Sequence, residues 1–409
     1  MRILMLSQYF YPENFIINDI VSKLVDQGHE VTVATGKPNY PDGKVFEGYT
    51  PNGIQREKYL NVVEVVRVPL WPRGHGGARN LILNYLSFVF FGIVCFPWLL
   101  RKSKFDAILV FAPSPITQAI PAVILKWFTR ARLALWVQDL WPESLAATGF
   151  VKNRHVLKAV GWIVKSIYRY CDLLLVQSRA FIEPVARYAD RQKIVYHPNS
   201  YNTHIDATAP VAKELLELLD NHFCVVFAGN LGTAQSLDTL VQAAIELRDD
   251  SSIRLVLIGS GSRLEWLEAQ RTAHELDNLV LPGRFPMNAM PQIFERASAL
   301  LVSLTDEAIF TQTIPSKIQA YLAAGRPIIA SVSGEGARVV LDAGAGFASD
   351  AGQVAPLVAN IRRMKALQAP ERDVMGRSGR AYFDEYFDMD RQVEILAQLL
   401  GHDPRGKAE

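Results

Sequence analysis

Cysteine is scarce in this sequence. Cys95, Cys171 and Cys224 are spread over 409 residues, and no two of them have the close spacing of a metal-binding or redox pair. A disulfide-rich secreted domain and a cysteine-ligated metal cluster are therefore excluded, and a reducing compartment is expected. The segment 1–6 is too short for the apolar core of a signal peptide, and it predicts a first strand instead.

Net charge is also small, at +2, but it is unevenly distributed. Residues 1–205 contain 24 Lys and Arg against 14 Asp and Glu, a net charge of +10, whereas the remainder contains 19 against 27, a net charge of −8. The basic half is expected to meet an anionic surface or substrate. The sequence contains no nucleic-acid recognition motif, so nucleic acid is not an expected partner.

A chain of 409 residues is too long for one hydrophobic core, so two domains are expected. Short apolar strands alternate with segments of helical periodicity, as in the first unit of strand 3–6, helix to about 27 and strand 30–35. This alternation predicts an α/β fold with doubly wound parallel sheets. Ligands of such sheets bind beyond the carboxyl ends of the strands.

Two acidic residues in the first half follow predicted strands. Glu13 comes after the first strand and is a catalytic candidate, or only a partner of the following helix dipole. Asp139 follows the strand 133–137, and it is either a catalytic or acceptor-binding residue or the cap of the next segment. The Gly- and Pro-rich excursion 36–60 contains the segment 37–41, which is either a lid or a structural loop.

Residues 81–100 contain no charged side chain, and Arg101-Lys102-Ser103-Lys104 follows them. Their length matches a membrane span, a helix docked on a membrane surface or a core helix. Asn84 and Pro97 interrupt the segment, and predicted strands on both sides must join one sheet, which favours docking of residues 79–104 on a membrane surface. A basic amphipathic helix over 154–169 suggests a second membrane-facing element, although salt-bridged surface helices have the same pattern.

The second half combines glycine loops with a cationic helix start. Gly229, Asn230 and Gly232 follow a predicted strand, and glycines let backbone N–H groups approach a diphosphate. Arg284 follows another strand. Segment 314–331 predicts a loop, a helix whose first turn contains Pro315, Ser316 and Lys317, a left-handed Gly325 and a strand. The helix dipole and the ammonium group together predict a phosphate site, and the alternative is an ordinary αβ unit with a solvated lysine.

Five ordered segments carry a family resemblance. They are Phe10-Tyr11-Pro12, residues 28–33, Gln138-Asp139-Leu140-Trp141-Pro142-Glu143, residues 227–232, and Pro315-Ser316-Lys317 with Ala323-Ala324-Gly325-Arg326-Pro327. Taken in this order over nearly the whole chain, they resemble the retaining glycosyltransferases of family 4, which have the GT-B fold. The resemblance is greatest to bacterial colanic-acid and O-antigen transferases of the fucosyl or N-acetyl-L-fucosaminyl type.

The resemblance implies two Rossmann-like domains facing each other across a cleft. Residues 1–203 would bind the acceptor and the membrane, 204–384 would bind the nucleotide sugar, and 385–409 would form a helix and tail that cross back to the first domain. The implied reaction is a retaining transfer of an N-acetylated or deoxy hexose from a nucleotide diphosphate, expected to be a UDP-sugar. The acceptor would be a polyprenyl-diphosphate-linked saccharide in the synthesis of O-antigen, capsule or exopolysaccharide.

No metal and no separate cofactor are implied, and the enzyme would be cytoplasmic and peripheral at the inner face of the cell membrane. The resemblance also assigns roles to residues. Lys317 would be catalytic together with Asp139 and Glu13, and the donor would be bound by Gly229, Asn230, Gly232, Arg284, Gln312, Ser316 and Lys317. Positive groups at the diphosphate would stabilise the charge that develops on the leaving group.

The sequence departs from the family pattern at several of these positions. Where the family commonly has two glutamates eight residues apart, this chain has Gln312 and Ala320. Asn230 and Gln235 replace an arginine and a lysine of the glycine loop, and Asn14-Phe15 replaces a Gly-Gly pair. Donor recognition is therefore expected to differ in detail, with Lys317 supplying the lost charge. Two alternatives are a sugar-nucleotide epimerase of the same fold and an inactive nucleotide-sugar-binding member.

Overall fold

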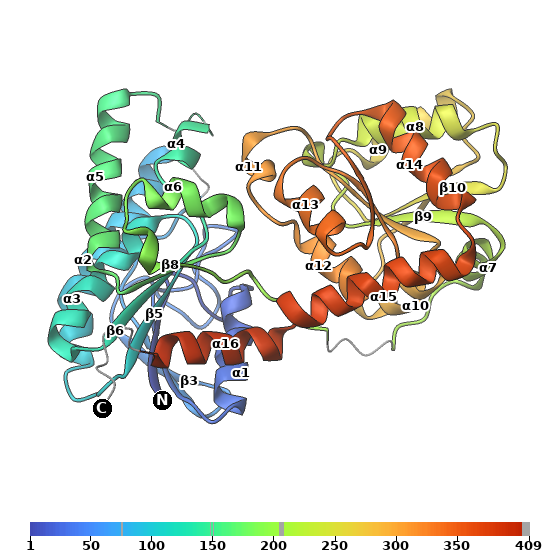
Figure 1. Ribbon diagram of the computed structural model, residues 1–409. Coiled ribbons are helices and arrows are strands. Elements are labelled where there is room, and N and C mark those ends of the chain that lie inside the picture. Colours follow the sequence, from blue (N-terminus) through green and yellow to red (C-terminus); the bar gives the residue numbers. More distant parts are fainter. Residues whose placement is uncertain (75–76, 148, 150, 204–207, 403–409) are drawn as a thin grey trace. The chain divides into compact units, whose positions relative to one another are not determined.

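A computed structural model of the protein describes residues 1–74, 77–147, 149, 151–203 and 208–402. The chain forms two compact units, one comprising 1–199 and 389–409 and the other comprising 200–388 (Figure 1). The sequence suggested domain boundaries at 203/204 and 384/385, whereas the two units divide at 199/200 and 388/389. Each unit is an α/β layer structure with helices on both faces of a sheet, because the strands are apolar on both sides.

The first unit contains an eight-stranded sheet in the order β3-β4-β2-β1-β5-β6-β7-β8. The strands are β1 (Arg2–Leu6), β2 (Glu30–Thr35), β3 (Gln55–Tyr59), β4 (Val63–Arg67), β5 (Ala107–Ala112), β6 (Arg132–Val137), β7 (Leu173–Val176) and β8 (Ile194–Tyr196). Its helices are α1 (Ile16–Asp26), α2 (Ala78–Leu99), α3 (Ile120–Thr129), α4 (Glu143–Ala147), α5 (Arg154–Tyr170), α6 (Ile182–Ala186) and α16 (Met389–Gly401). All neighbouring strands are parallel except β3 and β4. The excursion expected over 36–60 therefore ends in an antiparallel edge strand, which the sequence did not predict.

The second unit contains a six-stranded parallel sheet in the order β11-β10-β9-β12-β13-β14. The strands are β9 (Phe223–Ala228), β10 (Ile253–Ile258), β11 (Leu279–Gly283), β12 (Ala299–Ser303), β13 (Ile328–Ser331) and β14 (Gly346–Ser349). The helices are α7 (Lys213–Asn221), α8 (Leu237–Leu247), α9 (Leu264–Ala273), α10 (Met290–Arg296), α11 (Ala308–Thr311), α12 (Ser316–Ala323), α13 (Glu335–Asp342), α14 (Val354–Ala366) and α15 (Ala369–Tyr386). Strand order reverses between β9 and β12, which is where such sheets bind ligands.

The uncharged segment 81–100 forms most of α2, which connects β4 to β5 within one sheet. Asn84, Phe88, Gly92 and Phe96 form a buried stripe at four-residue spacing. A Cβ atom at Gly92 would lie 2.7 Å from Cγ of Pro121, so α2 packs closely on α3. Among the described residues α2 is the one helix long and apolar enough to cross a membrane. Its packing along this stripe favours a crossover helix over a span.

The chain returns to the first unit through α16, which lies beside α1 (Figure 1). Met389, Val393, Leu396 and Leu400 of α16 are buried in the same cluster as the apolar face of α1. The sequence suggested one helix with a tail over 385–409, but in the structure residues 385–386 belong to α15 and a separate helix, α16, starts at Met389 after a break at Phe387 and Asp388. The backbone N–H of Tyr201 donates to the carbonyl of Phe387, which holds this break beside the start of the second unit.

Candidate functional site

A cavity of about 690 Å³ lies at the carboxyl edge of the second sheet. Its walls come from the loops after β9, β10 and β11, from α10 and α12, and from residues of α15 and of the segment before α7. The lining residues are Tyr201, Thr203, Ala228, Gly229, Asn230, Ile258, Gly259, Ser260, Arg284, Phe285, Pro286, Met287, Met290, Pro291, Phe294, Ser316, Lys317, Ala320, Tyr321, Ala323, Ala324 and Arg380. The cavity lies wholly within residues 200–388.

Glycines bring two strand-end loops into contact at the edge of this cavity. Gly229 and Gly259 both have φ of +145°, a conformation that side chains disfavour. A Cβ atom on Gly259 would lie 1.8 Å from the carbonyl oxygen of Gly229, and one on Gly229 would lie 2.5 Å from Cε of Lys317. Only glycine therefore allows this close approach of the two loops and the lysine.

Lys317 lies in the first turn of α12, whose N-cap is Pro315. The sequence predicted that Pro315 lies inside the first turn, so the predicted start of the helix was one residue too early. The Lys317 ammonium donates to Oε1 of Gln235 at 2.5 Å and lies 3.7 Å from the centre of the Phe227 ring. Burial lowers the pKa of Lys317 to about 7, and the groups that its ammonium contacts, Gln235 and Phe227, are neutral. A bound anion would therefore stabilise the charged form of this group.

The cavity wall carries three cationic side chains, Arg284, Lys317 and Arg380, and no carboxylate among the described residues. The rest of the wall is largely apolar, with Phe285 and Phe294 among its larger side chains. No group of three or more His, Cys, Asp or Glu in the described ranges could hold a metal ion. A cavity of this kind favours a ligand that combines an anionic group with a flat or apolar group.

The structure brings together five of the seven residues expected to bind a donor, since Gly229, Asn230, Arg284, Ser316 and Lys317 all line this cavity. Gly232 does not line it, and a Cβ atom there would lie 2.6 Å from Nδ2 of Asn230. Gln312 does not line it either, because it caps the end of α11. Ala320, which stands where the family pattern has its second glutamate, is part of the cavity wall.

Sequence reasoning missed two residues at this cavity. The Arg380 guanidinium donates to the carbonyl of Ala323 at 3.0 Å, and its position depends on the packing of α15 against α12. The Tyr321 hydroxyl accepts a hydrogen bond from the N–H of Ala228 at 3.0 Å and so ties α12 to the end of β9. No local pattern distinguishes either residue, because both act through tertiary contacts.

In the first unit, Glu13 is 1% exposed and its carboxylate accepts three backbone hydrogen bonds. The N–H groups of Asn39 and Tyr40 donate to it at 2.8 Å, and that of Phe10 donates at 3.2 Å. Burial raises the pKa of Glu13 to about 7, while the three N–H donors oppose the rise. These contacts make Glu13 an anchor for the loop after β2.

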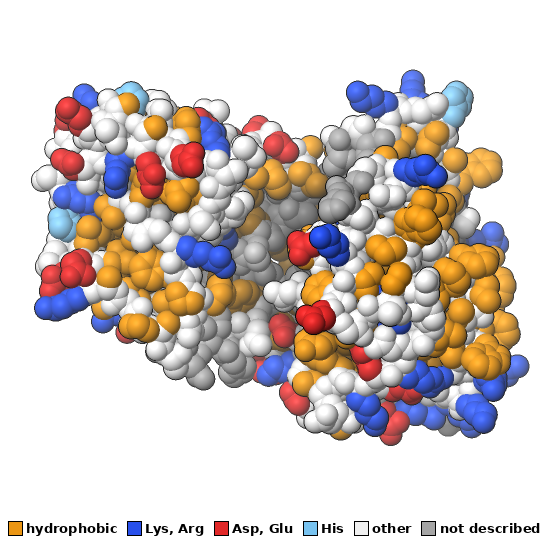
Figure 2. Space-filling model, turned by 180° about the vertical axis from the view of Figure 1, so that it is seen from behind, with side chains coloured by type: hydrophobic (Ala, Val, Ile, Leu, Met, Phe, Trp, Pro, Cys, Tyr) orange, Lys and Arg blue, Asp and Glu red, His pale blue; other side chains and the backbone are white. Residues whose placement is uncertain are grey.

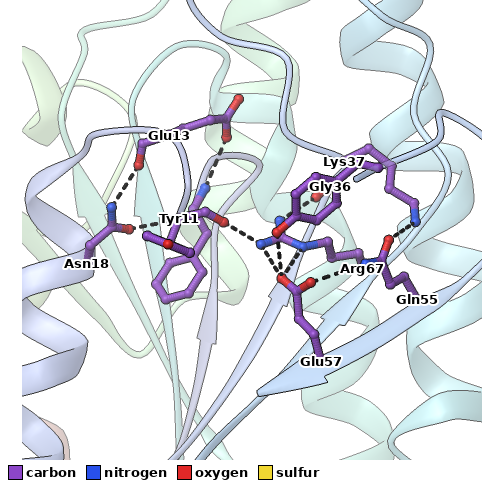
Figure 3. A network of polar contacts seen from close by, with 10 residues as sticks. Tyr11, Glu13, Asn18, Gly36, Lys37, Gln55, Glu57 and Arg67 are labelled. Atoms are coloured by element: carbon purple, nitrogen blue, oxygen red, sulfur yellow. Dashed lines mark hydrogen bonds and ion pairs between the residues drawn. The ribbon is translucent and has the colours of Figure 1, made fainter. Parts of the chain in front are cut away.

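A second buried network holds the same loop (Figure 3). The Arg67 guanidinium, which is fully buried, donates to the carbonyl of Gly36 at 3.0 Å and to Glu57 at 2.7 Å, and it also contacts the carbonyl of Tyr11. The buried Lys37 donates to Gln55 at 2.9 Å. Of the two interpretations of segment 37–41, this anchoring favours a structural loop over a lid.

Asp139 follows β6 at the carboxyl edge of the first sheet and is half-buried. Its Oδ2 accepts a hydrogen bond from the indole N–H of Trp141 at 3.2 Å, and the same N–H donates to the hydroxyl of Ser114 at 3.0 Å. Thus Asp139 is held at the edge where ligands of a parallel sheet bind, beside a polar loop from β5.

Two family models match the chain. Residues 213–382 match the model described as Glycosyl transferases group 1, and residues 14–200 match the model described as Glycosyl transferase 4-like domain. Glu13 lies directly before the range 14–200, and Asp139 lies within it. Most of the cavity wall lies within 213–382.

The Escherichia coli K12 protein WcaI, whose name assigns it to colanic acid biosynthesis as a glycosyl transferase, is 25% identical over 426 residues that cover 99% of this chain and 100% of that protein. Among solved structures, Anabaena HepE in complex with UDP has a TM-score of 0.69 at 14% identity, covering 98% of this chain and 99% of that one. Sucrose-phosphate synthase of Thermosynechococcus elongatus has a TM-score of 0.70 at 17% identity, with coverages of 97% and 98%. These two similarities concern the fold alone.

Proposed function

Because the chain belongs to the family-4 glycosyltransferases with the GT-B fold, we propose that it transfers a sugar from a nucleotide diphosphate to a lipid-linked saccharide in surface polysaccharide synthesis. We expect the donor to be a UDP-sugar with an N-acetylated or deoxy hexose, and the acceptor to carry a polyprenyl diphosphate. One observation carries the proposal. The Lys317 ammonium lies close to the backbone of Gly229, in a cavity whose described lining residues include no carboxylate.

The donor diphosphate would lie between the loop at Gly229 and the first turn of α12. Lys317 donates hydrogen bonds to it, and the helix dipole adds to the positive potential there. Arg284 or Arg380 would meet a second phosphate oxygen or the base, and the apolar wall at Phe285 would pack against the base. The Anabaena HepE structure is a complex with UDP, which supports uridine as the base of the proposed donor.

In the proposed reaction the bond between the sugar C1 and the diphosphate oxygen breaks, and the acceptor oxygen bonds to C1 on the same face. Negative charge develops on the departing diphosphate, so a cation at Lys317 stabilises the transition state more than the ground state. The acceptor hydroxyl gives its proton to the departing diphosphate. The proposal needs no metal ion, since Lys317 and the loop N–H groups supply the positive charge.

Asp139 would orient the acceptor hydroxyl, because it is half-buried at the carboxyl edge of the first sheet. Glu13 would act only by fixing the adjacent loop, since its carboxylate already accepts three N–H groups. An acceptor-binding aspartate predicts that Asp139→Asn weakens acceptor use and leaves donor binding unchanged.

We further propose that the first unit docks on the inner face of the cell membrane. One face of α2 exposes Ile82, Leu86, Phe90, Val94 and Trp98 at four-residue spacing, each 46–61% exposed. Basic residues follow at Arg101, Lys102 and Lys104, and the neighbouring α3 exposes Trp127 and Phe128. Figure 2 shows hydrophobic side chains gathered on the first unit, at the right of the view, with Lys and Arg side chains beside them. An apolar stripe with basic residues suits an anionic lipid surface.

The helix α5 would extend this surface. Its exposed side combines Trp162 with Lys158, Lys165 and Arg169, and Tyr170 at its end lies 5.8 Å from Trp127 of α3, ring centre to ring centre. The enzyme would thus be cytoplasmic and peripheral, with α2, α3 and α5 on the lipid.

Incubation with radiolabelled UDP-sugars and membranes from a producing bacterium tests the proposed reaction. The expected result is label in the lipid fraction that mild acid releases as saccharide. Addition of EDTA to the incubation should not reduce the amount of label transferred. Label that stays in the nucleotide fraction as a second UDP-sugar would instead identify an epimerase. Donor binding with no turnover on any acceptor would identify an inactive member.

A further inference from the structure

A guanidinium group lies inside a cage of aromatic rings at the carboxyl edge of the first sheet. The Arg73 side chain is 5.1 Å from the ring centre of Tyr40, 5.5 Å from that of Tyr9 and 5.7 Å from that of Tyr85. It also donates to the hydroxyls of Tyr9 at 2.9 Å and Tyr85 at 3.0 Å. Tyr9 is buried and forms the floor, Tyr85 is half-buried, and Tyr40 is exposed at the rim.

Buried amides underneath hold this cage in place. The Asn84 side chain donates to Oδ1 of Asn39 at 3.3 Å, and it accepts from the Gln8 side chain at 2.7 Å. The same Asn39 oxygen accepts from the backbone N–H of Arg73 at 3.2 Å. Three loops and α2 are therefore tied together beneath the guanidinium, so the cage is formed before any ligand binds.

The charge of Arg73 is not neutralised within the described residues, where no carboxylate lies within 4.0 Å of it. Burial raises the pKa of both Tyr9 and Tyr85, so the two hydroxyls that contact Arg73 stay neutral. The hydroxyl partners of the guanidinium in the cage are therefore neutral. Arginine in such a setting suits a phosphate, because its planar donors match two phosphate oxygens.

The cage lies beside the apolar stripe of α2. Tyr85 belongs to that helix, and the exposed Ile82 and Leu86 lie within one turn of it. The stripe continues to Trp98, a length of about 24 Å at the usual rise per residue. A ligand with a phosphate at one end and a long apolar chain would therefore satisfy Arg73 and the stripe together.

Hydrogen bonds also connect the cage to the loop that holds Asp139, the residue that we propose to orient the acceptor. The Tyr9 hydroxyl donates to the carbonyl of Ser114 at 3.3 Å, and the hydroxyl of Ser114 accepts from Trp141. The Asp139 carboxylate is close enough to contribute to the raised pKa of Tyr85. The cage around Arg73 is thus connected both to the helix that carries the apolar stripe and to the loops at Ser114 and Asp139.

We propose that Arg73 binds the diphosphate of the lipid-linked acceptor and so sets which lipids the enzyme uses. This inference rests on the proposed function. It differs from the general docking of α2 and α5, because it requires a specific phosphate group rather than a negatively charged surface. If Arg73 only clamped the loops at Tyr9 and Tyr40, its loss would lower stability without changing the choice of lipid.

The test uses phosphatidylcholine vesicles of equal surface charge, which contain either a few per cent of polyprenyl diphosphate or polyprenol with phosphatidylglycerol. Sedimentation measures the partition of the full-length protein, and the ratio between the two vesicle types reports binding of the diphosphate beyond the effect of surface charge. For the wild type we expect a ratio of about ten, the contribution of charged hydrogen bonds. Arg73→Gln should reduce the ratio to about one. Lys58→Gln, which removes one exposed charge from the edge strand β3, should leave it at about ten.

The melting transition of the first unit, followed by differential scanning calorimetry, serves as the folding control for both variants, because Arg73 and Lys58 both lie in that unit. If Arg73→Gln fails this folding control, Tyr85→Phe is used in its place. This variant removes one hydroxyl partner of Arg73 but keeps the ring, and it should lower the ratio. A ratio of one for the wild type, or equal losses for Arg73→Gln and Lys58→Gln, would overturn the inference. So would inorganic pyrophosphate that raises the melting temperature of the first unit as much as the lipid does, since the site would then bind a free anion.

The vesicle ratio needs no sugar transfer, so it separates the two proposals. A ratio that depends on Arg73 in a protein with no transferase activity would contradict the proposed function and leave the diphosphate site standing. Transfer to lipid by an Arg73→Gln variant at the wild-type rate and KM would contradict the site and leave the function standing.

Discussion

At the scale of single residues, the Lys317 ammonium is held against the Phe227 ring and the Gln235 side chain. Burial lowers the pKa of Lys317 to about 7, so the ammonium group loses its proton near neutral pH. An anion bound beside this group favours its charged form and raises its pKa. Donor binding should therefore take up a proton.

This coupling predicts that affinity for a UDP-sugar falls as pH rises above about 7. The slope is at most tenfold per pH unit, because one proton is involved. The UDP-sugar diphosphate has no titration of its own in this range. Calorimetric titration between pH 6 and 9 measures the slope. Lys317→Arg stays charged throughout and should give a flat profile, whereas equal slopes in both proteins would contradict the assignment.

At the scale of elements, α2 has two apolar faces with different surroundings. One is packed along Asn84 and Gly92, and the other is exposed along Phe90 and Trp98. The sequence predicts the helix and its length, but it cannot assign the faces, because both are apolar and only the packing of α3 distinguishes them. Among the described residues of its own unit, the exposed face has no protein partner, which supports a lipid partner.

The exposed face predicts a specific loss on mutation. Phe90→Ser together with Trp98→Ser should reduce partition onto anionic vesicles by about ten- to a hundredfold, because each side chain loses its burial in lipid. The melting temperature should change little, since both side chains are exposed in the protein. Leu341→Ser with Val374→Ser, which changes two exposed apolar residues of the second unit, is the matched control and should bind as the wild type. Equal partition of both double variants would argue against docking by α2.

Several elements around the cavity follow from the sequence alone. The apolar runs of β9 and β10 end in glycines, and Gly325, with φ of +66°, ends the α12 segment as its left-handed residue. These are local effects, so periodicity and turn chemistry predict them. The tyrosine cage around Arg73 and the contact of Arg380 with α12 join segments far apart in the chain, and only the folded structure reveals them.

At the scale of the whole molecule, the chain leaves the first unit after Asn199 and returns at Met389. The returning helix α16 completes one face of the first sheet, where Val393 and Leu396 are fully or almost fully buried. Arg132 at the start of β6 donates to the carbonyl of Leu399, which fixes the end of the helix. The first unit is therefore built from both ends of the sequence.

Truncation after Asp388 should accordingly destabilise the first unit by several kcal/mol, because the apolar face beneath α16 becomes exposed. Differential scanning calorimetry should show one transition lost or shifted down, while UDP still raises the melting temperature of the other. A chain ending at His402 keeps α16 and serves as the control. Unchanged transitions after the longer truncation would contradict this role of α16.

The most direct test of the central claim is calorimetric titration of a UDP-sugar into the wild type and Lys317→Ala. If the diphosphate lies beside Lys317, the variant should bind about ten- to a hundredfold more weakly, the contribution of a charged hydrogen bond. Lys213→Ala, an exposed lysine of the same unit, should bind as the wild type. Equal dissociation constants for Lys317→Ala and the wild type would contradict the account.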